Sequence, residues 1–418
     1  YIKIMIKSLL LSLSLPTTNQ EDLNEEIEEM KRLANTLGYS IEDSLIQNKQ
    51  TIDSATFFGK GKIQNIVNQC KELKYNTIFI NNEIDPGHFK RIQKIAGDKI
   101  YVIDRTKLIL DIFTKHAKTI ESKKQVELAA VQYMMPRLIG QWTHLERQMG
   151  GVGTRGGPGE KQIEIDRRLL RRDINKLKKD LSQIEKQRIT QRKSRKSVYK
   201  VALVGYTNAG KSSIFKNLSG HKTYIKDELF ATLDTTTKNI SLDDSSKILL
   251  SDTVGFLRNL PTGLIASFRS TLGEIKDADL LLKIIDISSS DISGHLNTIE
   301  ETLKILECHK KKSIIVFNKI DIINDNNIYK ELKIKYKDAL FVSSLKKLNI
   351  NILIKSIIDI VNENLKIYTI KLPYNSISII DYIYTNTNVI DRKDQFDYIK
   401  LSFRSTKGMY NKILKKSK

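Results

Sequence analysis

The sequence predicts an α/β protein of more than one domain, and three observations support that prediction. Short apolar runs with the length of buried strands alternate with segments of helical period along most of the 418 residues. A glycine-containing loop at 205–212 stands between one such run and a helical segment, and a long charged segment of helical period occupies 160–196. At 48.0 kDa, the chain is long enough for two or three domains.

The first 120 residues predict a small α/β domain with a parallel sheet, because strands and helices alternate there with short links. The expected strands are 2–15, 77–80 and 99–103, and the expected helices are 21–37, 61–73 and 86–96. The apolar run 2–15 has some features of a signal peptide, but we interpret it as the first strand. The first residue is not Met, which leaves room for an upstream segment, including one that targets an organelle.

Residues 121–197 predict an antiparallel helical hairpin. Its first arm has helical period over 125–148 with a kink expected at Pro136, and its second arm is the charged segment 160–196. The tip at 148–160 is too rich in glycine for a helix, and the alternative for it is a flexible linker. Four arginines crowd one stretch of the second arm, and the alternative for them is a solvated helix face. They are Arg167, Arg168, Arg171 and Arg172.

The segment from Gly205 to Ser212 fits G-x-x-x-x-G-K-[ST], the loop that cradles nucleotide phosphates. It follows a strand-like run at 198–204 and precedes the start of a helix at 213–218. In that context, small residues let backbone N–H groups close around phosphate oxygens, and the helix N-terminus adds a positive dipole. The loop therefore predicts a nucleotide-binding domain with Lys211 at the phosphates.

A second motif, Asn318-Lys-Ile-Asp321, follows another strand-like run and predicts that the base is guanine. The Asp321 carboxylate can accept hydrogen bonds from guanine N1–H and the exocyclic amine, whereas adenine has no donor at either place. Asn318 is expected to brace the phosphate loop, and the stem of Lys319 to lie over the ring. Ser343-Ser-Leu345 is the expected third contact to guanine, through the backbone.

Between these motifs lie the expected catalytic elements. Asp252-Thr-Val-Gly255 follows a strand-like run, so that its carboxylate can hold Mg²⁺ through a water and the Gly255 N–H can reach the γ-phosphate. The Ser212 hydroxyl is the expected direct Mg²⁺ ligand. Thr232, in the polar segment where a switch loop belongs, is the expected second hydroxyl ligand. The three threonines that follow Asp234 are the alternatives.

Two further residues bear on the rate of hydrolysis. Phe256 stands where Ras-like enzymes have a Gln that orients the attacking water, and a phenyl ring cannot hydrogen-bond water. We therefore expect slow intrinsic hydrolysis and activation by a partner; packing beneath the switch is a structural role compatible with this. Asn208 raises the hypothesis of a bound K⁺ that does the work of an arginine finger, and the alternative is an ordinary loop Asn.

The predicted fold is therefore α/β, with a P-loop GTPase domain at 198–365. It is preceded by a small α/β domain (1–120) with a long helical hairpin (121–197) and followed by a small α/β domain (366–418).

The net charge of the chain is +22, from 70 basic and 48 acidic side chains. This charge favours a polyanionic partner, and nucleic acid is the first candidate. Part of that charge fits the Lys-, Ile- and Asn-rich composition that an AT-rich genome favours. The two cysteines suit a reducing compartment, and no apolar run is long enough to cross a bilayer.

The chain resembles the HflX family of GTPases along nearly its full length, and the glycine-rich tip is the segment most specific to that family. Ser213 and Thr235 depart from residues usual in the family, and neither is among the predicted catalytic residues. The segments that carry the resemblance are Phe58-Gly-Lys-Gly-Lys62, Val102-Ile-Asp-Arg-Thr106, Leu108-Ile-Leu-Asp-Ile-Phe113, Gln125-Val-Glu-Leu-Ala129, Pro136-Arg-Leu, Gly153-Thr-Arg-Gly-Gly-Pro-Gly-Glu160, Gly205 to Ser212, Phe230-Ala-Thr-Leu-Asp234 and Asp252-Thr-Val-Gly-Phe-Leu-Arg-Asn-Leu-Pro261.

The resemblance implies a ribosome-associated GTPase that binds the large subunit with GTP, splits or rescues stalled ribosomes, and leaves after hydrolysis. We also expect Mg²⁺ as cofactor, a monomer off the ribosome and no membrane insertion. The expected location is the cytoplasm, and an organelle stroma or matrix is the alternative. The hairpin would carry its tip, with Arg155, towards the peptidyl-transferase region, and shape-based RNA recognition suits such a tip. The alternatives are a GTPase in RNA folding, modification or ribosome assembly, and a nucleotide-binding scaffold without useful turnover.

The predicted site residues fall into four groups. The catalytic residues are Lys211, Asp252 and Gly255, and the Mg²⁺ ligands are Ser212 and Thr232. The RNA contacts are Arg155, Arg167, Arg168, Arg171 and Arg172. The GTP-binding residues are Gly205, Tyr206, Thr207, Asn208, Ala209, Gly210, Lys211, Ser212, Ser213, Phe230, Ala231, Thr232, Leu233, Asp234, Asp252, Thr253, Val254, Gly255, Asn318, Lys319, Ile320, Asp321, Ser343, Ser344 and Leu345.

Overall fold

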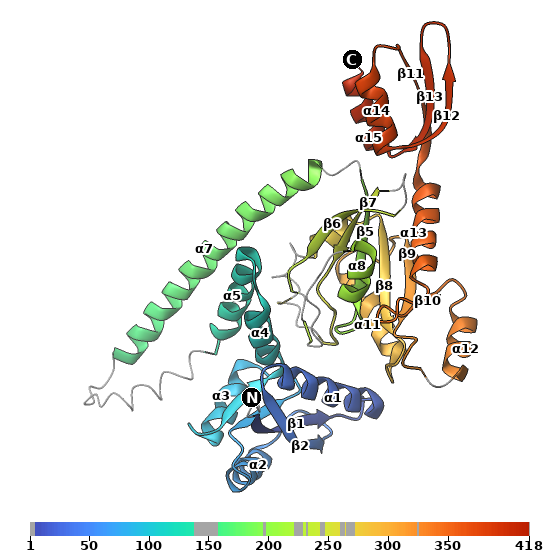
Figure 1. The fold of residues 1–418 in the computed structure, drawn as a ribbon. Coiled ribbons are helices and arrows are strands. Elements are labelled where there is room, and N and C mark those ends of the chain that lie inside the picture. Colours follow the sequence, from blue (N-terminus) through green and yellow to red (C-terminus); the bar gives the residue numbers. More distant parts are fainter. Residues whose placement is uncertain are drawn as a thin grey trace. The chain divides into compact units, whose positions relative to one another are not determined.

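The computed structural model confirms the predicted fold class, and its chain divides into two compact units (Figure 1). It describes residues 5–137, 158–194, 198–220, 229–230, 233–242, 247–259, 264, 272–323 and 326–417. The first unit contains the described residues up to 184 together with 229–230, 258–259 and 264, and the second contains the others. Each unit has its own hydrophobic core.

The first unit is built on a four-stranded parallel sheet in the order β2-β1-β3-β4. The central strand β1 is buried from Ser8 to Ser14, as expected for a parallel sheet covered on both faces. The strands are β1 (Ile6–Ser14), β2 (Tyr39–Asn48), β3 (Thr77–Ile80) and β4 (Tyr101–Asp104). The helices that accompany them are α1 (Gln20–Thr36), α2 (Lys60–Glu72), α3 (Pro86–Ala96) and α4 (Arg105–His116).

The predicted strands and helices of this unit are present within a few residues, but the sequence analysis missed β2 and α4. Strand β2 alternates half-buried and exposed residues at the sheet edge, so it lacks the apolar run by which the other strands were found. Helix α4 begins directly after β4, where the Asp104 side chain caps it by accepting the Lys107 N–H (2.8 Å). Because no loop residues separate β4 from α4, the sequence shows no turn signal at the boundary between them.

Two further helices belong to the predicted hairpin: α5 (Ile120–Met134) and α7 (Pro158–Ser194). They pack together through Leu128 of α5 and through Ile174 and Leu177 of α7, which are all buried. Helix α5 ends before Pro136, which cannot continue a helix without losing a hydrogen bond. The part of the predicted first arm at 138–148 lies outside the described residues. Most of the predicted tip, with Arg155, lies outside the described residues.

The second unit contains a six-stranded sheet in the order β10-β9-β8-β5-β7-β6, in which only β6 is antiparallel to its neighbour. The strands are β5 (Tyr199–Gly205), β6 (Thr236–Ser241), β7 (Lys247–Asp252), β8 (Leu280–Asp286), β9 (Ser313–Asn318) and β10 (Leu340–Phe341). The helices are α8 (Lys211–Ser219), α10 (Gly273–Asp277), α11 (Ile292–Ile305), α12 (Asn326–Lys335) and α13 (Ile350–Asn364). The apolar run at 277–286 contains β8, and α10 ends at its first residue, Asp277.

The chain continues into an antiparallel three-stranded sheet in the order β11-β13-β12, which packs against two helices. The central strand β13 alternates buried and half-buried residues, so that Ile399, Leu401 and Phe403 face the helices. The elements are β11 (Lys366–Leu372), α14 (Ile377–Asn386), β12 (Asn388–Asp394), β13 (Ile399–Ser405) and α15 (Lys407–Lys416). This confirms the small α/β domain predicted at the end of the chain.

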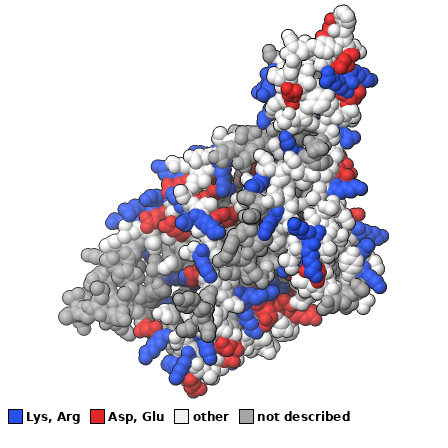
Figure 2. Space-filling model, in the orientation of Figure 1, with Lys and Arg blue, Asp and Glu red and all other residues white. Residues whose placement is uncertain are grey.

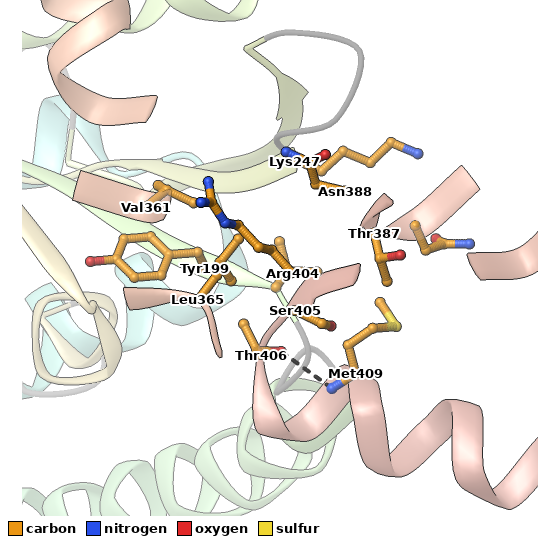
Figure 3. Close-up of a pocket in the computed structure, with 12 residues that line it drawn as sticks. Tyr199, Lys247, Val361, Leu365, Thr387, Asn388, Arg404, Ser405, Thr406 and Met409 are labelled. Carbon is orange, nitrogen blue, oxygen red and sulfur yellow. Dashed lines mark hydrogen bonds between the residues drawn. The ribbon is translucent and has the colours of Figure 1, made fainter. Parts of the chain in front are cut away.

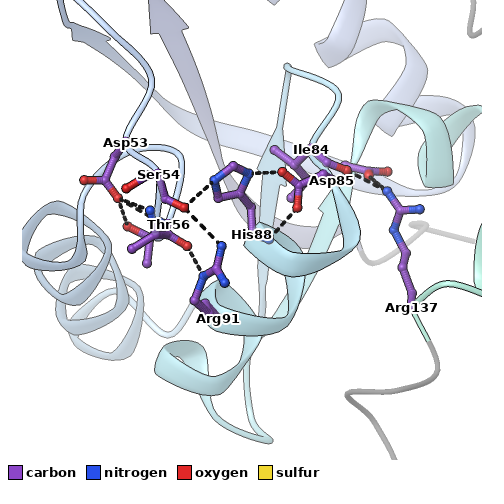
Figure 4. A network of polar contacts seen from close by, with 10 residues as sticks. Asp53, Ser54, Thr56, Ile84, Asp85, His88, Arg91 and Arg137 are labelled. Atoms are coloured by element: carbon purple, nitrogen blue, oxygen red, sulfur yellow. Dashed lines mark hydrogen bonds and ion pairs between the residues drawn. The ribbon is translucent and has the colours of Figure 1, made fainter.

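A turn at 53–57 is held onto α3 by polar contacts within the first unit (Figure 4). The His88 ring lies between the Asp85 carboxylate and the Ser54 carbonyl oxygen (3.2 Å), and Arg91 donates to that same carbonyl (3.2 Å). Asp53 accepts hydrogen bonds from two backbone N–H groups of the turn. Arg91 and His88 therefore stabilise the local fold.

The first unit also contains a buried ion pair between Arg105 and Glu29. Arg105 donates further hydrogen bonds to the Asn81 side chain (3.2 Å) and to the carbonyl oxygen of Arg258 (3.1 Å), which belongs to the same unit. Asn259, the next residue, donates to Glu26 of α1 (2.8 Å). A segment from later in the chain is thus anchored among the charged groups of this unit.

Replacing Arg105 tests how much this buried pair stabilises the first unit. Arg105→Ala leaves the buried Glu29 carboxylate without its Arg105 partner, so we expect the free energy of local opening to fall by about 3–5 kcal/mol. Hydrogen exchange of α1 and α4, followed by mass spectrometry, measures it. The matched control is Lys31→Ala, which removes an exposed pair with Glu28 and is expected to cost less than about 1 kcal/mol. Equal protection in the two variants would contradict the prediction.

Candidate functional site

The three predicted nucleotide-binding motifs meet at the carboxyl edge of the six-stranded sheet. Strands β5, β7 and β9 end at Gly205, Asp252 and Asn318, and the loops that follow carry the three sequence motifs. Open α/β sheets bind their ligands at this edge. The parallel order of the strands brings together motifs that lie more than a hundred residues apart in the chain.

The phosphate loop connects β5 to α8 through two positions that require glycine. Gly210 has φ of +90°, and a Cβ there would lie 2.1 Å from Nδ2 of Asn318. A Cβ on Gly205 would lie 2.2 Å from the carbonyl oxygen of Ile284 on the neighbouring strand. Asn208 has φ of +61°, a conformation that Asn tolerates better than most residues. The loop is therefore fixed by close backbone approach.

Lys211, the first residue of α8, is buried inside this loop. Its ammonium group donates to the carbonyl oxygens of Gly205 (3.1 Å) and Tyr206 (2.7 Å). Burial lowers the pKa of Lys211 to about 8, against the opposing effect of the nearby Asp252 carboxylate. A phosphate group would replace the solvation that the buried ammonium lacks.

Ser212 and Asp252 form the second polar cluster. The Ser212 hydroxyl donates to Oδ2 of Asp252 (2.6 Å), whereas Oδ1 of the same carboxylate is buried without a hydrogen-bond partner. Burial raises the pKa of Asp252, against the lowering effects of the Ser212 hydroxyl and the Lys211 ammonium. A hydroxyl and a carboxylate oxygen are ligands that Mg²⁺ prefers, so these residues fit the metal implied by the fold.

Asn318 ties the phosphate loop to the loop after β10. Its amide Nδ2 donates to the carbonyl oxygen of Ala209 (3.0 Å), and its Oδ1 accepts from the Ser344 N–H (2.9 Å). The side chain is fully buried. The Ser344 carbonyl in turn accepts from Asn217 of α8 (2.7 Å). These contacts place Ser343, Ser344 and Leu345 beside the phosphate loop.

Lys319 and Asp321 follow Asn318 at the same edge. Oδ1 of Asp321 is buried and has no hydrogen-bond partner, so the carboxylate has an unused acceptor. Lys319 has φ of +68°, and its ammonium group pairs with Oδ2 of Asp286 (2.6 Å) at the end of β8. Sequence reasoning missed Asp286, although a carboxylate at a strand end was the signal by which it found Asp252.

The Asp252–Gly255 segment packs tightly against the phosphate loop. A Cβ on Gly255 would lie 2.8 Å from Cα of Thr207 and 3.1 Å from Nζ of Lys211, so only glycine fits there. Phe256 pairs with the loop through its backbone, and its side chain is only 3% exposed. The position that follows Gly255 therefore offers no side-chain hydrogen bond for an attacking water.

Several other predicted site residues differ in their burial and in the unit to which they belong. Thr253 and Val254 are buried beside Asp252, Leu233 is buried, and Leu345 is 80% exposed. Phe230 belongs to the first unit, where its ring meets Phe113 edge to face at 4.7 Å between centroids. Ala231 and Thr232, the predicted second Mg²⁺ ligand, lie outside the described residues.

The four predicted RNA-contacting arginines lie on α7, where three are exposed and Arg167 is half-buried. They lie in the part of α7 that precedes Ile174, the first α7 residue in the cluster through which α7 packs on α5. On the face drawn in Figure 2, Lys and Arg side chains are spread over the surface and interspersed with Asp and Glu. On that face, the basic side chains therefore do not gather in a single patch.

One pocket of the second unit lies apart from these motifs (Figure 3). Tyr199 and Lys247 line it from the six-stranded sheet, Arg404 from β13 and Met409 from α15. None of its lining residues is among the predicted GTP-binding residues. Lys247 is engaged there with the carbonyl oxygen of Thr385 (2.8 Å). The pocket therefore does not change the assignment of the nucleotide site.

The fold and the three loops define a P-loop GTPase, and comparison with known proteins agrees. A family model described as 50S ribosome-binding GTPase matches residues 200–319. Models described as GTP-binding GTPase N-terminal and GTP-binding GTPase Middle Region match residues 24–114 and 116–195. No helix among the described residues is both long and apolar enough to cross a membrane.

A GTPase HflX of Flavobacterium psychrophilum is 38% identical over 412 residues, covering 94% of this chain and 97% of that relative. A GTPase HflX of Escherichia coli (strain K12) is 39% identical over 310 residues, covering 74% of this chain and 72% of that relative. The chain therefore belongs to the HflX family and is a GTPase, as the resemblance implied. A crystal structure of a GTP-binding protein from Sulfolobus solfataricus with GDP is 25% identical over 85% of this chain and 98% of that one, with a TM-score of 0.44.

The buried ammonium of Lys211 predicts that nucleotide affinity depends on pH. Below pH 8 the free protein already carries the charge, whereas above it binding must take up a proton. The charged fraction falls from about nine-tenths at pH 7 to about one quarter at pH 8.5, so we expect about fourfold weaker GDP binding. Calorimetry at both pH values, in buffers of different ionisation enthalpy, measures affinity and proton uptake. Equal affinity without proton uptake would contradict the assignment.

Proposed function

We propose that this GTPase acts on the large ribosomal subunit, splits or rescues stalled ribosomes, and is activated by the subunit. The observation that carries the proposal is the buried Phe256, which offers no hydrogen bond to an attacking water. Slow intrinsic hydrolysis is the expected consequence, and a large partner that completes the site relieves it. The matching family model, whose description names binding to the 50S ribosome, supports the same partner.

In this proposal, the three loops divide the recognition of GTP between them. The phosphate loop and Lys211 bind the phosphates, because the buried ammonium and the N-terminus of α8 supply positive charge there. Asp321 reads guanine through its unused buried oxygen, and the Lys319 stem lies on the ring. The backbone at Ser343, Ser344 and Leu345 supplies the third contact.

Mg²⁺ would be held by the hydroxyl of Ser212 and, through a water, by Asp252, with Thr232 as the second hydroxyl ligand. When bound, the metal neutralises charge on the β- and γ-phosphate oxygens. The Gly255 N–H would contact the γ-phosphate, because the absence of a side chain leaves its backbone close to Lys211. K⁺ at Asn208 remains part of the proposal, and equal hydrolysis rates in K⁺ and Na⁺ buffers would remove it.

Substitution of Asp321, the residue proposed to recognise guanine, tests that recognition. Asp321→Asn replaces an acceptor with an amide donor, which complements the N1 and O2 edge of xanthine instead of guanine. We expect GDP affinity to fall by about a hundredfold and XDP affinity to rise above that of GDP. Titration of both nucleotides against the wild type and the variant measures it. Retention of guanine preference would show that Asp321 is not the base reader.

The helical hairpin (121–197) is the proposed RNA-binding element. Arg167, Arg168, Arg171 and Arg172 on α7 would contact phosphates, and Arg155 would act at the tip. We propose the domain boundaries 1–120, 121–197, 198–365 and 366–418, with the last two forming the GTPase and the C-terminal domain. A cytoplasmic location and a monomeric state off the ribosome belong to the same proposal.

Removal of the four α7 arginines tests the contact with RNA. Substitution of all four by Ala is expected to weaken binding to purified large subunits at least tenfold and to flatten its dependence on salt, because fewer counterions are released. The matched control removes four basic residues of α15 (Lys407, Lys412, Lys415 and Lys416). Co-sedimentation over a range of salt concentrations measures both. Equal losses would assign the effect to net charge, and no loss would favour action away from intact subunits.

A further inference from the structure

We propose that Asp286 is a positioning residue for the guanine site and that it acts through Lys319. The inference rests on the role proposed above for Lys319, and it requires no ribosome. Asp286 is the last residue of β8, paired in register with Asn318 at the end of β9. Its Oδ2 lies 2.6 Å from Nζ of Lys319, and both side chains are largely buried, with exposures of 19% and 24%.

The carboxylate of Asp286 is itself held in place. Its Oδ1 accepts two hydrogen bonds from Ser288, one from the backbone N–H (3.0 Å) and one from the hydroxyl (2.6 Å). The Ile287 N–H donates to the carbonyl oxygen of Asn318 (3.1 Å), which joins the two strand ends beyond the sheet. One carboxylate oxygen is thus fixed by its own turn, and the other is presented to Lys319.

The backbone conformation of Lys319 shows how its ion pair with Asp286 can affect the guanine site as well as the stability of the fold. Its φ of +68° lies in the left-handed region, which residues other than glycine rarely occupy. The carbonyl oxygen of Lys319 accepts the Ile322 N–H (3.1 Å), so the following turn, which contains Asp321, is built on that conformation. The ion pair fixes the end of a side chain with four rotatable bonds above a strained backbone.

The consequence concerns nucleotide affinity. A free lysine side chain loses rotamer freedom when a base packs on its stem, whereas one already held by Asp286 has lost much of it before binding. The stem of Lys319 packs on the face of the base, so it does not contact the exocyclic amine at the edge of guanine. Asp286 therefore contributes equally to the binding of guanine and hypoxanthine nucleotides, in contrast to Asp321, which distinguishes the two.

A double-mutant cycle tests the inference with GDP and IDP as probes and the full chain without ribosomes. Asp286→Asn removes the charge, and we expect about fivefold to tenfold weaker binding, by the same factor for both nucleotides. Lys319→Met keeps most of the stem without its charge, and in that background Asp286→Asn is expected to have no further effect. Asp291→Asn is the control, because Asn also caps the start of α11 and the affinity stays unchanged.

The outcomes separate this inference from the proposed site. Unchanged GDP affinity in Asp286→Asn would overturn the positioning role. The same role is overturned if Asp286→Asn causes an equal loss of affinity in the wild-type and Lys319→Met backgrounds. A loss for GDP alone would assign Asp286 to reading the amine and also overturn it. If Lys319→Met binds both nucleotides as tightly as wild type, the role of Lys319 itself fails.

Discussion

The two hydrogen bonds of the Asn318 side chain are the interaction on which the nucleotide site depends. One reaches the carbonyl oxygen of Ala209 in the phosphate loop and the other the N–H of Ser344, so a single buried amide fixes the spacing of three loops. The amide lies so close to Gly210 that no side chain fits at that position. Gly210 of the phosphate loop and Asn318 of the base-recognition motif therefore pack directly against each other.

Around this brace, the site carries polar groups whose burial costs free energy without a ligand. The Lys211 ammonium is buried, and its lowered pKa shows that its two hydrogen bonds to backbone carbonyls offset only part of its lost solvation. Single carboxylate oxygens of Asp252 and Asp321 are buried without hydrogen-bond partners. Buried polar groups of this kind destabilise the fold until a partner satisfies them. Phosphate oxygens, a divalent cation and the donor edge of guanine complement the three groups. The electrostatics of the site therefore point to the same ligand as its sequence motifs.

The sequence predicted the GTPase domain and the N-terminal parallel sheet because apolar runs and glycine-containing loops report strand ends directly. It did not predict β2, whose half-exposed pattern at the sheet edge carries little hydrophobic signal. It also missed Asp286, since nothing in the chain near residue 286 shows that β8 lies beside β9. The Arg105–Glu29 pair was hidden for the same reason, because its partners lie 76 residues apart and meet only through the fold.

The nucleotide site has the three GTP-binding motifs, but the buried Phe256 after Gly255 cannot position an attacking water. We propose that rapid turnover therefore requires the large ribosomal subunit. The most direct test is the rate of GTP hydrolysis at saturating GTP, measured alone and with purified large subunits. We expect slow turnover alone and at least a tenfold stimulation by the subunits, since the missing water-positioning group is worth several kcal/mol, roughly 10²-fold or more in rate. Tight GTP binding with no stimulation would contradict it.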